Sequence, residues 1–205
     1  MRIRSILLAA IAAIATTALV VQAQVPGVNS TLNSVFTLAY DNSTMKQTYS
    51  ATVSGASPAA SATDVCSLAG SATKTIKVRR VLFTSTPTTA VTEPISVLMR
   101  STASTGAGSA IATMSYDSAN AANTSALVEV WTSNPTAGTL TGVLADVAIG
   151  FGISTTANTP FANTFVFGQL GQPIVLRGVA QQVAVNLSGI TFTGTFGCTF
   201  EWTEE

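Results

Sequence analysis

Hydrophobic and polar residues alternate in short runs over the last two thirds of this 205-residue chain. The clearest runs span 64–70, 74–86, 95–102, 109–117, 126–133, 139–152, 164–169, 173–178, 182–189 and 191–203. Glycine, proline and asparagine residues separate them, as expected of turns between strands. Many short strands with frequent turns are typical of a β-sandwich. We therefore expect an all-β fold, a jelly-roll-like antiparallel β-sandwich of about ten strands.

The N-terminus has the pattern of a secretory signal. Arg2 and Arg4 precede an uncharged apolar stretch over residues 6–21, and Ala23 offers a small residue at a cleavage position. A positive start, an apolar middle and a small-residue end define a signal peptide. We expect residues 1–23 to be a signal peptide or, alternatively, an uncleaved anchor. Membrane contact is expected only through this segment, and only if it stays uncleaved.

The rest of the chain divides at a region of weak patterning. Residues 34–40 and 46–55 alternate like strands, but residues 55–63 are rich in alanine, serine and proline and have the composition of a linker. We expect residues 24–63 to form an N-terminal arm or linker and residues 64–205 to form the β-sandwich domain.

The chain has two cysteines, Cys66 and Cys198. An even number of cysteines in an exported chain favours a disulfide. Cys66 falls on the first expected strand of the domain and Cys198 on the last, and such strands often lie side by side in a sandwich. The alternative is two independent buried thiols.

Four basic residues gather in the run 70–86. Lys77 and Arg79 alternate with apolar neighbours, but Arg80 falls where the next apolar residue is expected. Either a β-bulge at Arg79 and Arg80 re-phases the strand, or the strand passes from a half-buried into a fully buried region. In both cases Lys77 and Arg79 face solvent. This face is either a solvated strand face that discourages edge pairing or a partner-facing basic strand formed by Lys77, Arg79 and Arg80.

Composition argues against several kinds of chemistry. The chain contains no histidine, the residue most used for acid–base catalysis and metal binding near neutral pH. Only 9% of its residues are charged, and loss of Arg2 and Arg4 would leave seven basic and nine acidic residues, a net charge of −2. A nucleic-acid-binding domain is strongly basic. We expect no nucleic-acid partner, no metal, no cofactor and no enzymatic activity.

The carboxylates and aromatic residues give no catalytic pattern. All nine carboxylates, Glu129 and Glu201 among them, are expected on solvent-exposed faces. The Ser71–Lys74 spacing resembles a catalytic pair, but it precedes a strand and not a helix, so we read it as chance. Several late aromatic residues share one parity: Phe192, Phe196, Phe200 and Trp202. We interpret them as core residues, with a carbohydrate-stacking platform as the alternative.

Several segments resemble a family of small proteins from tailed-phage, prophage and environmental viral genomes. They read DVCSLAGSATKTIKVRRVLFTST, VLMRSTASTGAGSA, MSYDSANAANTSALVEVWTSNPTAGTLTGVL, GQPIVLRGVAQQVAVNLSG and EWTEE. The resemblance covers roughly residues 64–205. It implies a virion-associated β-sandwich of the decoration, fibre-base or tail-accessory type. The N-terminal signal departs from that pattern, because phage structural proteins assemble in the cytoplasm.

These observations together predict a non-enzymatic structural or interaction protein. We expect it to act through subunit packing, by self-association or with other structural subunits, as a virion-associated or prophage-derived protein. The alternative is a secreted cell-surface or carbohydrate-binding module with a glycan partner. The expected location is exported (periplasmic, extracellular or cell-surface), or the virion if the phage resemblance holds.

Overall fold

The computed structural model describes residues 46–119, 124–151, 160–169, 171–191 and 193–205. The predicted signal segment 1–23 lies outside this part of the chain, as does most of the predicted arm. The described residues form one compact unit from Lys46 to Glu205. They contain twelve strands and no helix, so no membrane-spanning helix occurs among them.

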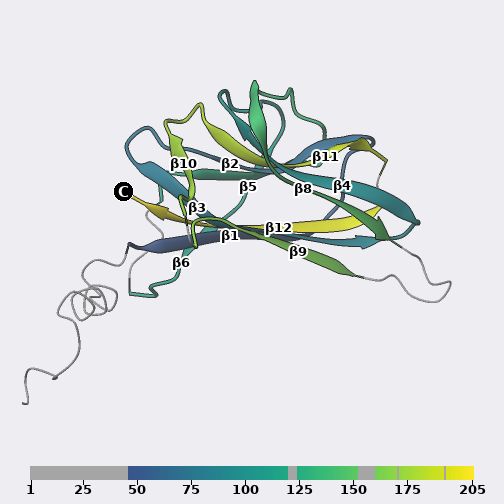
Figure 1. The fold of residues 1–205 in the computed structure, drawn as a ribbon, viewed down its shortest axis with the longest axis horizontal. Helices are drawn as coiled ribbons and strands as arrows, with labels where there is room; N and C mark the ends of the chain where they lie inside the picture. The colour runs from purple at the N-terminus through teal and green to yellow at the C-terminus, as the bar shows by residue number, and fades with distance from the viewer. Residues whose placement is uncertain (1–45, 120–123, 152–159, 170, 192) are drawn as a thin grey trace, which may run out of the picture. The chain divides into compact units, whose positions relative to one another are not determined.

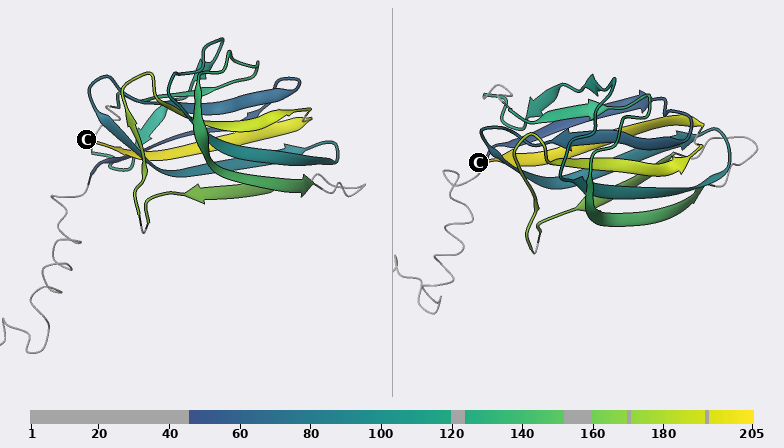
Figure 2. Two further views of the ribbon diagram at one scale, coloured as in Figure 1. Left: turned by 45° about the horizontal axis from the view of Figure 1, so that its top comes forward. Right: turned by 90° about the horizontal axis from the view of Figure 1, so that it is seen from above.

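The strands form two antiparallel sheets that pack face to face (Figures 1 and 2). Sheet A contains β1 (Thr48–Ala56), β3 (Thr75–Pro87), β6 (Thr113–Ser115), β9 (Phe161–Val166), β10 (Ile174–Arg177) and β12 (Gly194–Glu204). Sheet B contains β2 (Ala62–Ala69), β4 (Val91–Arg100), β5 (Ser109–Ala110), β7 (Leu127–Val130), β8 (Leu140–Phe151) and β11 (Gln182–Ile190). The predicted all-β sandwich is confirmed.

The strand order is that of a jelly roll. Sheet A runs β10–β3–β12–β1–β6, with β9 on the same edge of β3 as β10, and sheet B runs β5–β7–β2–β11–β4–β8. Eight principal strands, β9 and β10 counting as one interrupted strand, are divided four and four between the sheets in jelly-roll order. The short strands β5, β6 and β7 lie in the connection between β4 and β8. They extend the edges formed by β1 and β2.

The sandwich starts earlier than the sequence pattern predicts. β1 lies between β12 and β6 and pairs with β12 from Thr48 to Ala56. The predicted boundary at residue 64 is therefore wrong, because the expected arm 24–63 includes a central strand of sheet A. Residues 57–61, interpreted as part of a linker, instead carry the chain from sheet A to sheet B.

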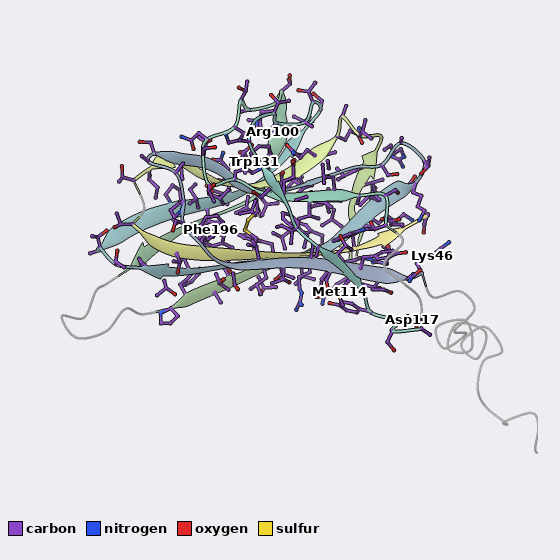
Figure 3. The ribbon with its side chains drawn as sticks, turned by 180° about the vertical axis from the view of Figure 1, so that it is seen from behind. Lys46, Arg100, Met114, Asp117, Trp131 and Phe196 are labelled. Atoms are coloured by element: carbon purple, nitrogen blue, oxygen red, sulfur yellow. A yellow bond between two sulfur atoms is a disulfide. The ribbon has the colours of Figure 1, made fainter. Side chains whose placement is uncertain are left out.

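Large apolar side chains fill the space between the sheets. Fully buried members include Phe83, Phe196, Phe200, Trp202 and Leu68. The rings of Phe83 and Phe196 stack with centroids 6.3 Å apart, and Figure 3 shows Phe196 pointing into this layer. The core interpretation of the late aromatic residues is thus confirmed for the three that are described; Phe192 lies outside the described residues.

A disulfide joins the two sheets through the core. Cys66 on β2 bonds Cys198 on β12 across a sequence separation of 132 residues, and Figure 3 shows the yellow bond between the layers. The predicted pairing is confirmed, although β1, and not β2, is the first strand of the domain.

Candidate interaction surfaces

The basic strand predicted from the sequence is β3, and it contains the predicted bulge. Glu201 of β12 pairs with Arg80, whereas the next residue, Trp202, pairs with Val78, so Arg79 is an extra residue in β3. Arg79 is exposed and Arg80 half-buried, and the residues on either side of this pair are buried. The bulge therefore places two consecutive guanidinium groups on the outer face of sheet A.

The carboxylates of Glu201 on β12 and of Glu205, which follows β12, neutralise two of the three basic residues. Arg80 bonds Glu201, which also accepts a hydrogen bond from the Tyr116 hydroxyl. Lys77 forms an ion pair with Glu205. The hydrogen bond with Glu201 raises the pKa of Arg80 above its ordinary value. The basic face is thus largely compensated within the sheet, which favours local ion pairing over a wide basic field.

A hollow of about 560 Å³ opens beside the bulge. We call it the bulge hollow, and it is lined by Arg79, Arg80, Thr164, Val166, Phe167, Gly168, Gln169 and Glu201. Its wall comes from β3, β12, β9 and the chain that follows β9. The sequence pattern identified the arginines but could not show that residues 164–169 pack beside them.

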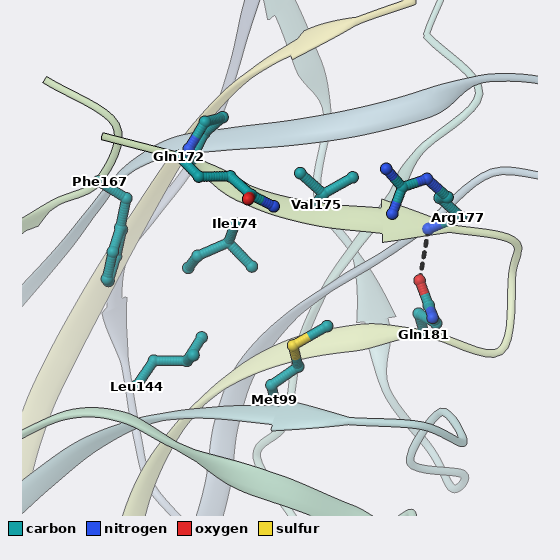
Figure 4. Close-up of a pocket in the computed structure, with 9 residues that line it drawn as sticks. Met99, Leu144, Phe167, Gln172, Ile174, Val175, Arg177 and Gln181 are labelled. Atoms are coloured by element: carbon teal, nitrogen blue, oxygen red, sulfur yellow. Dashed lines mark hydrogen bonds between the residues drawn. The ribbon is translucent and has the colours of Figure 1, made fainter. Parts of the chain in front are cut away.

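A second hollow lies at the side of the sandwich between β10 of sheet A and β4 and β8 of sheet B (Figure 4). We call it the side hollow. It has a volume of about 420 Å³ and is lined by Met99, Leu144, Phe167, Gln172, Pro173, Ile174, Val175, Arg177 and Gln181. Figure 4 shows Met99, Leu144 and Ile174 projecting into the space between the strands. Six of the nine lining residues are apolar, and Gln172, Arg177 and Gln181 add polar surface.

Strand β8 forms an unpaired edge of sheet B beside the side hollow. Its twelve residues include one charged residue, Asp146, and no proline. Leu140, Val143 and Leu144 are 52%, 56% and 39% exposed. Two register shifts against β4 make Thr141 and Leu144 bulge residues, whereas residues 145–151 pair with β4 without interruption. The second half of β8 therefore offers a regular, nearly uncharged edge.

Long, regular and uncharged edges are usually avoided in monomeric proteins. Natural sheets protect their edges with charges, prolines, bulges or covering segments. In the described part of the chain, the first half of β8 is protected by its two bulges, and the second half only by the single charge of Asp146. Among the described residues, no strand other than β4 pairs with β8. The sequence pattern identified β8 as a strand, but could not show that it is an edge.

A buried polar network occupies the outer side of sheet B. Asp64 accepts hydrogen bonds from Arg100 Nε and Nη2 at 3.0 and 2.8 Å, from Ser104 Oγ at 2.9 Å and from Asn186 Nδ2 at 2.6 Å. Arg100 also donates to the carbonyl oxygen of Gly138 at 2.7 Å. Both charges are thus satisfied, as buried charges require. This network attaches two loops to the sheet and leaves Asp64 without an exposed face for catalysis.

The same loops carry Trp131, whose ring is buried and whose Nε1 donates to Ser67 Oγ at 3.0 Å. Figure 3 shows Arg100 and Trp131 on the same side of the sandwich. Residues 101–108 and 131–139 therefore cover sheet B and hide polar residues of β2, β4 and β11.

Glu204 is a second buried carboxylate. It bonds Lys74 Nζ at 2.8 Å and Trp202 Nε1 at 3.1 Å, and the Thr124 hydroxyl also donates to it. Burial alone would raise the pKa of Glu204, but these hydrogen bonds outweigh it and the pKa is lowered. The expectation that every carboxylate lies on a solvent-exposed face is therefore wrong for Asp64 and Glu204.

The Ser71–Lys74 spacing has no catalytic geometry. The Lys74 ammonium bonds Glu204, and the Ser71 hydroxyl donates to Ser125 Oγ at 2.6 Å. Among the described residues there is also no group of three or more cysteine, aspartate or glutamate side chains placed to hold a metal ion.

Comparison with protein-family models, with curated proteins and with solved structures finds no match to this chain.

Proposed function

We propose that this protein is a non-enzymatic structural subunit that acts through self-association. The observation that carries the proposal is the unpaired edge of β8, with its exposed aliphatic residues and single charge. A low-charge edge can meet a second copy of itself with little repulsion. Jelly rolls occur in viral capsid proteins and also in lectins. The fold is therefore compatible with a structural role, and the proposal rests on the edge of β8.

Two contributions would stabilise such a contact. Backbone groups along residues 145–151 would hydrogen-bond a strand of the second copy, as in other cases of β-strand addition. Leu140, Val143 and Leu144 would bury their apolar surface, and each fully buried side chain contributes about 1.5–3 kcal/mol. The virion-associated or prophage-derived setting implied by the resemblance is part of this proposal. The disulfide supports an oxidising location, such as the periplasm or cell surface.

Size-exclusion chromatography with light scattering tests the proposal on the full chain. We expect the wild type to form an oligomer and Val143→Lys to shift it towards monomer, because the lysine places a charge in the contact. Val179→Lys is the matched control, since Val179 is also a strongly exposed valine, at 60%, but lies outside β8. A wild type that is monomeric at every concentration, or an equal effect of both lysines, would contradict the proposal.

The secreted glycan-binding module is a second candidate because of one observation. The bulge hollow combines an arginine with hydroxyl, amide and carboxylate groups in a space of a size common for small-ligand sites.

A further inference from the structure

The bulge hollow contains one guanidinium group that the fold leaves uncompensated. The ion pairs of the described residues involve Lys74, Lys77, Arg80 and Arg100, so Arg79 takes part in none of them. The charge of Arg79 does act on the carboxylate of Glu205, but the hydrogen bond to that carboxylate comes from Lys77. Arg79 therefore keeps its planar set of donors available at the hollow.

The bulge explains why Arg79 has this position. As the extra residue of β3, it has no partner in the register between β3 and β12, whereas Arg80 lies opposite Glu201. The carbonyl oxygen of Arg79 accepts a hydrogen bond at 2.8 Å from the backbone N–H of Phe167. This bond ties residue 79 to the segment that forms the other wall of the hollow.

The remaining groups of the hollow are those that recognise hydroxylated ligands. Thr164 and Gln169 supply a hydroxyl and an amide, and Val166 and Phe167 supply apolar surface. Arg80 and Tyr116 both donate hydrogen bonds to Oε1 of Glu201. Oε2 of this carboxylate can therefore accept a hydrogen bond from a ligand hydroxyl. This carboxylate disfavours polyanions such as nucleic acids, whereas one anionic group can still bind Arg79.

We propose that the bulge hollow binds a sugar acid, a saccharide unit with one carboxylate and several hydroxyl groups. The ligand carboxylate pairs with the guanidinium of Arg79 in the two-hydrogen-bond arrangement that arginine favours. The hydroxyl groups bond Glu201, Thr164 and Gln169. This inference rests on the glycan-binding candidate and specifies its ligand class. It does not rest on self-association through β8, which lies on the other sheet.

Isothermal titration calorimetry on the full chain tests it with three probes: an oligosaccharide with a single terminal galacturonate as its acidic group, the neutral oligosaccharide with galactose in that position, and inorganic phosphate. We expect binding of the acidic oligosaccharide only. Arg79→Gln should weaken that binding about tenfold or more, since a charge-assisted pair is lost. Lys77→Gln is the matched control, because it removes the same charge from the same strand outside the hollow.

Arg79→Lys and circular dichroism complete the test. Lys keeps the charge but loses the planar geometry, so we expect intermediate affinity with an unchanged fold. Three results would overturn the proposal: no binding of the acidic oligosaccharide, equal binding of the neutral one, or equal loss in the Arg79→Gln and Lys77→Gln variants. Phosphate that binds as tightly as the oligosaccharide would show a general anion site and would overturn the assignment to a sugar acid.

Discussion

Asp64 and Arg100 form a two-hydrogen-bond ion pair that the loops over sheet B seal from solvent. Their side chains are 0% and 6% exposed. Loss of one partner leaves the other charge buried and unpaired, which typically costs about 3–5 kcal/mol. The pair therefore gives the first prediction.

We expect Asp64→Ala and Arg100→Ala each to lower the free energy of unfolding by about 3–5 kcal/mol. The double variant should cost less than the sum of the two, because no unpaired charge remains. Urea denaturation measures all three. Lys77→Ala, at a partly exposed ion pair, should change the free energy of unfolding little, because solvent screens such pairs. Additive losses in the double variant would show that the two residues are not coupled.

The disulfide between Cys66 and Cys198 gives the second prediction. It closes a loop across 132 residues, for which the chain-entropy model gives about 5 kcal/mol and measured values typically reach 2–5 kcal/mol. The Cys66→Ala and Cys198→Ala double variant should unfold at a clearly lower denaturant concentration. The intact protein should show no free thiol on labelling under denaturing conditions. Two labelled thiols would disprove the bond.

Glu204 predicts a loss of stability in acid. Its pKa is lowered in the folded state, despite burial, by hydrogen bonds from Lys74, Thr124 and Trp202. A lowered folded pKa contributes stability above the unfolded pKa, and this contribution is lost as pH falls through the folded value. The stability of the wild type should thus decrease as the pH is lowered from about 4.5. The Glu204→Gln variant should be less stable than wild type at neutral pH, and its stability should decrease less steeply in acid. Parallel pH profiles of thermal unfolding would argue against this role.

Glu129 predicts the opposite pH dependence. Burial raises the pKa of this carboxyl on β7, so its charged form is disfavoured in the folded state. Its stabilising contribution is complete below the unfolded pKa and is lost as pH rises through the folded pKa. Glu129→Gln should therefore raise the melting temperature at pH 7, and the difference should disappear in acid. A variant less stable than wild type at pH 7 would point to an essential contact of the carboxylate.

The sequence pattern of β3 was informative because a break in the alternation of polar and apolar residues can indicate a β-bulge in the backbone. Arg80 breaks the parity set by Lys77 and Val78, and the structure resolves the alternatives as a bulge. The pairing of Cys66 with Cys198 followed from the general architecture. The bulge could be predicted from local sequence, and the disulfide from the order of the strands along the chain. Both kinds of information are present in a single sequence.

Other features depended on tertiary contacts that alternation does not encode. Asp64 is polar and was expected on a solvent-exposed face, but Arg100 and a loop distant in sequence cover it. The run 109–117 looked like one strand, yet β5 and β6 within it belong to different sheets. Residues 57–61 cross between the sheets, and a crossing loop has the same composition as a linker.

The central position of β12 has a consequence for how the protein is made. β12 pairs with both β1 and β3. These two strands are therefore not joined in sheet A until β12, the last strand, has been synthesised. The strands of sheet B, in contrast, all precede β12 in the chain and can pair before it is made. High sequence separation between paired strands also slows folding. The Cys66–Cys198 disulfide also needs β12, so it too can form only after that strand has been made.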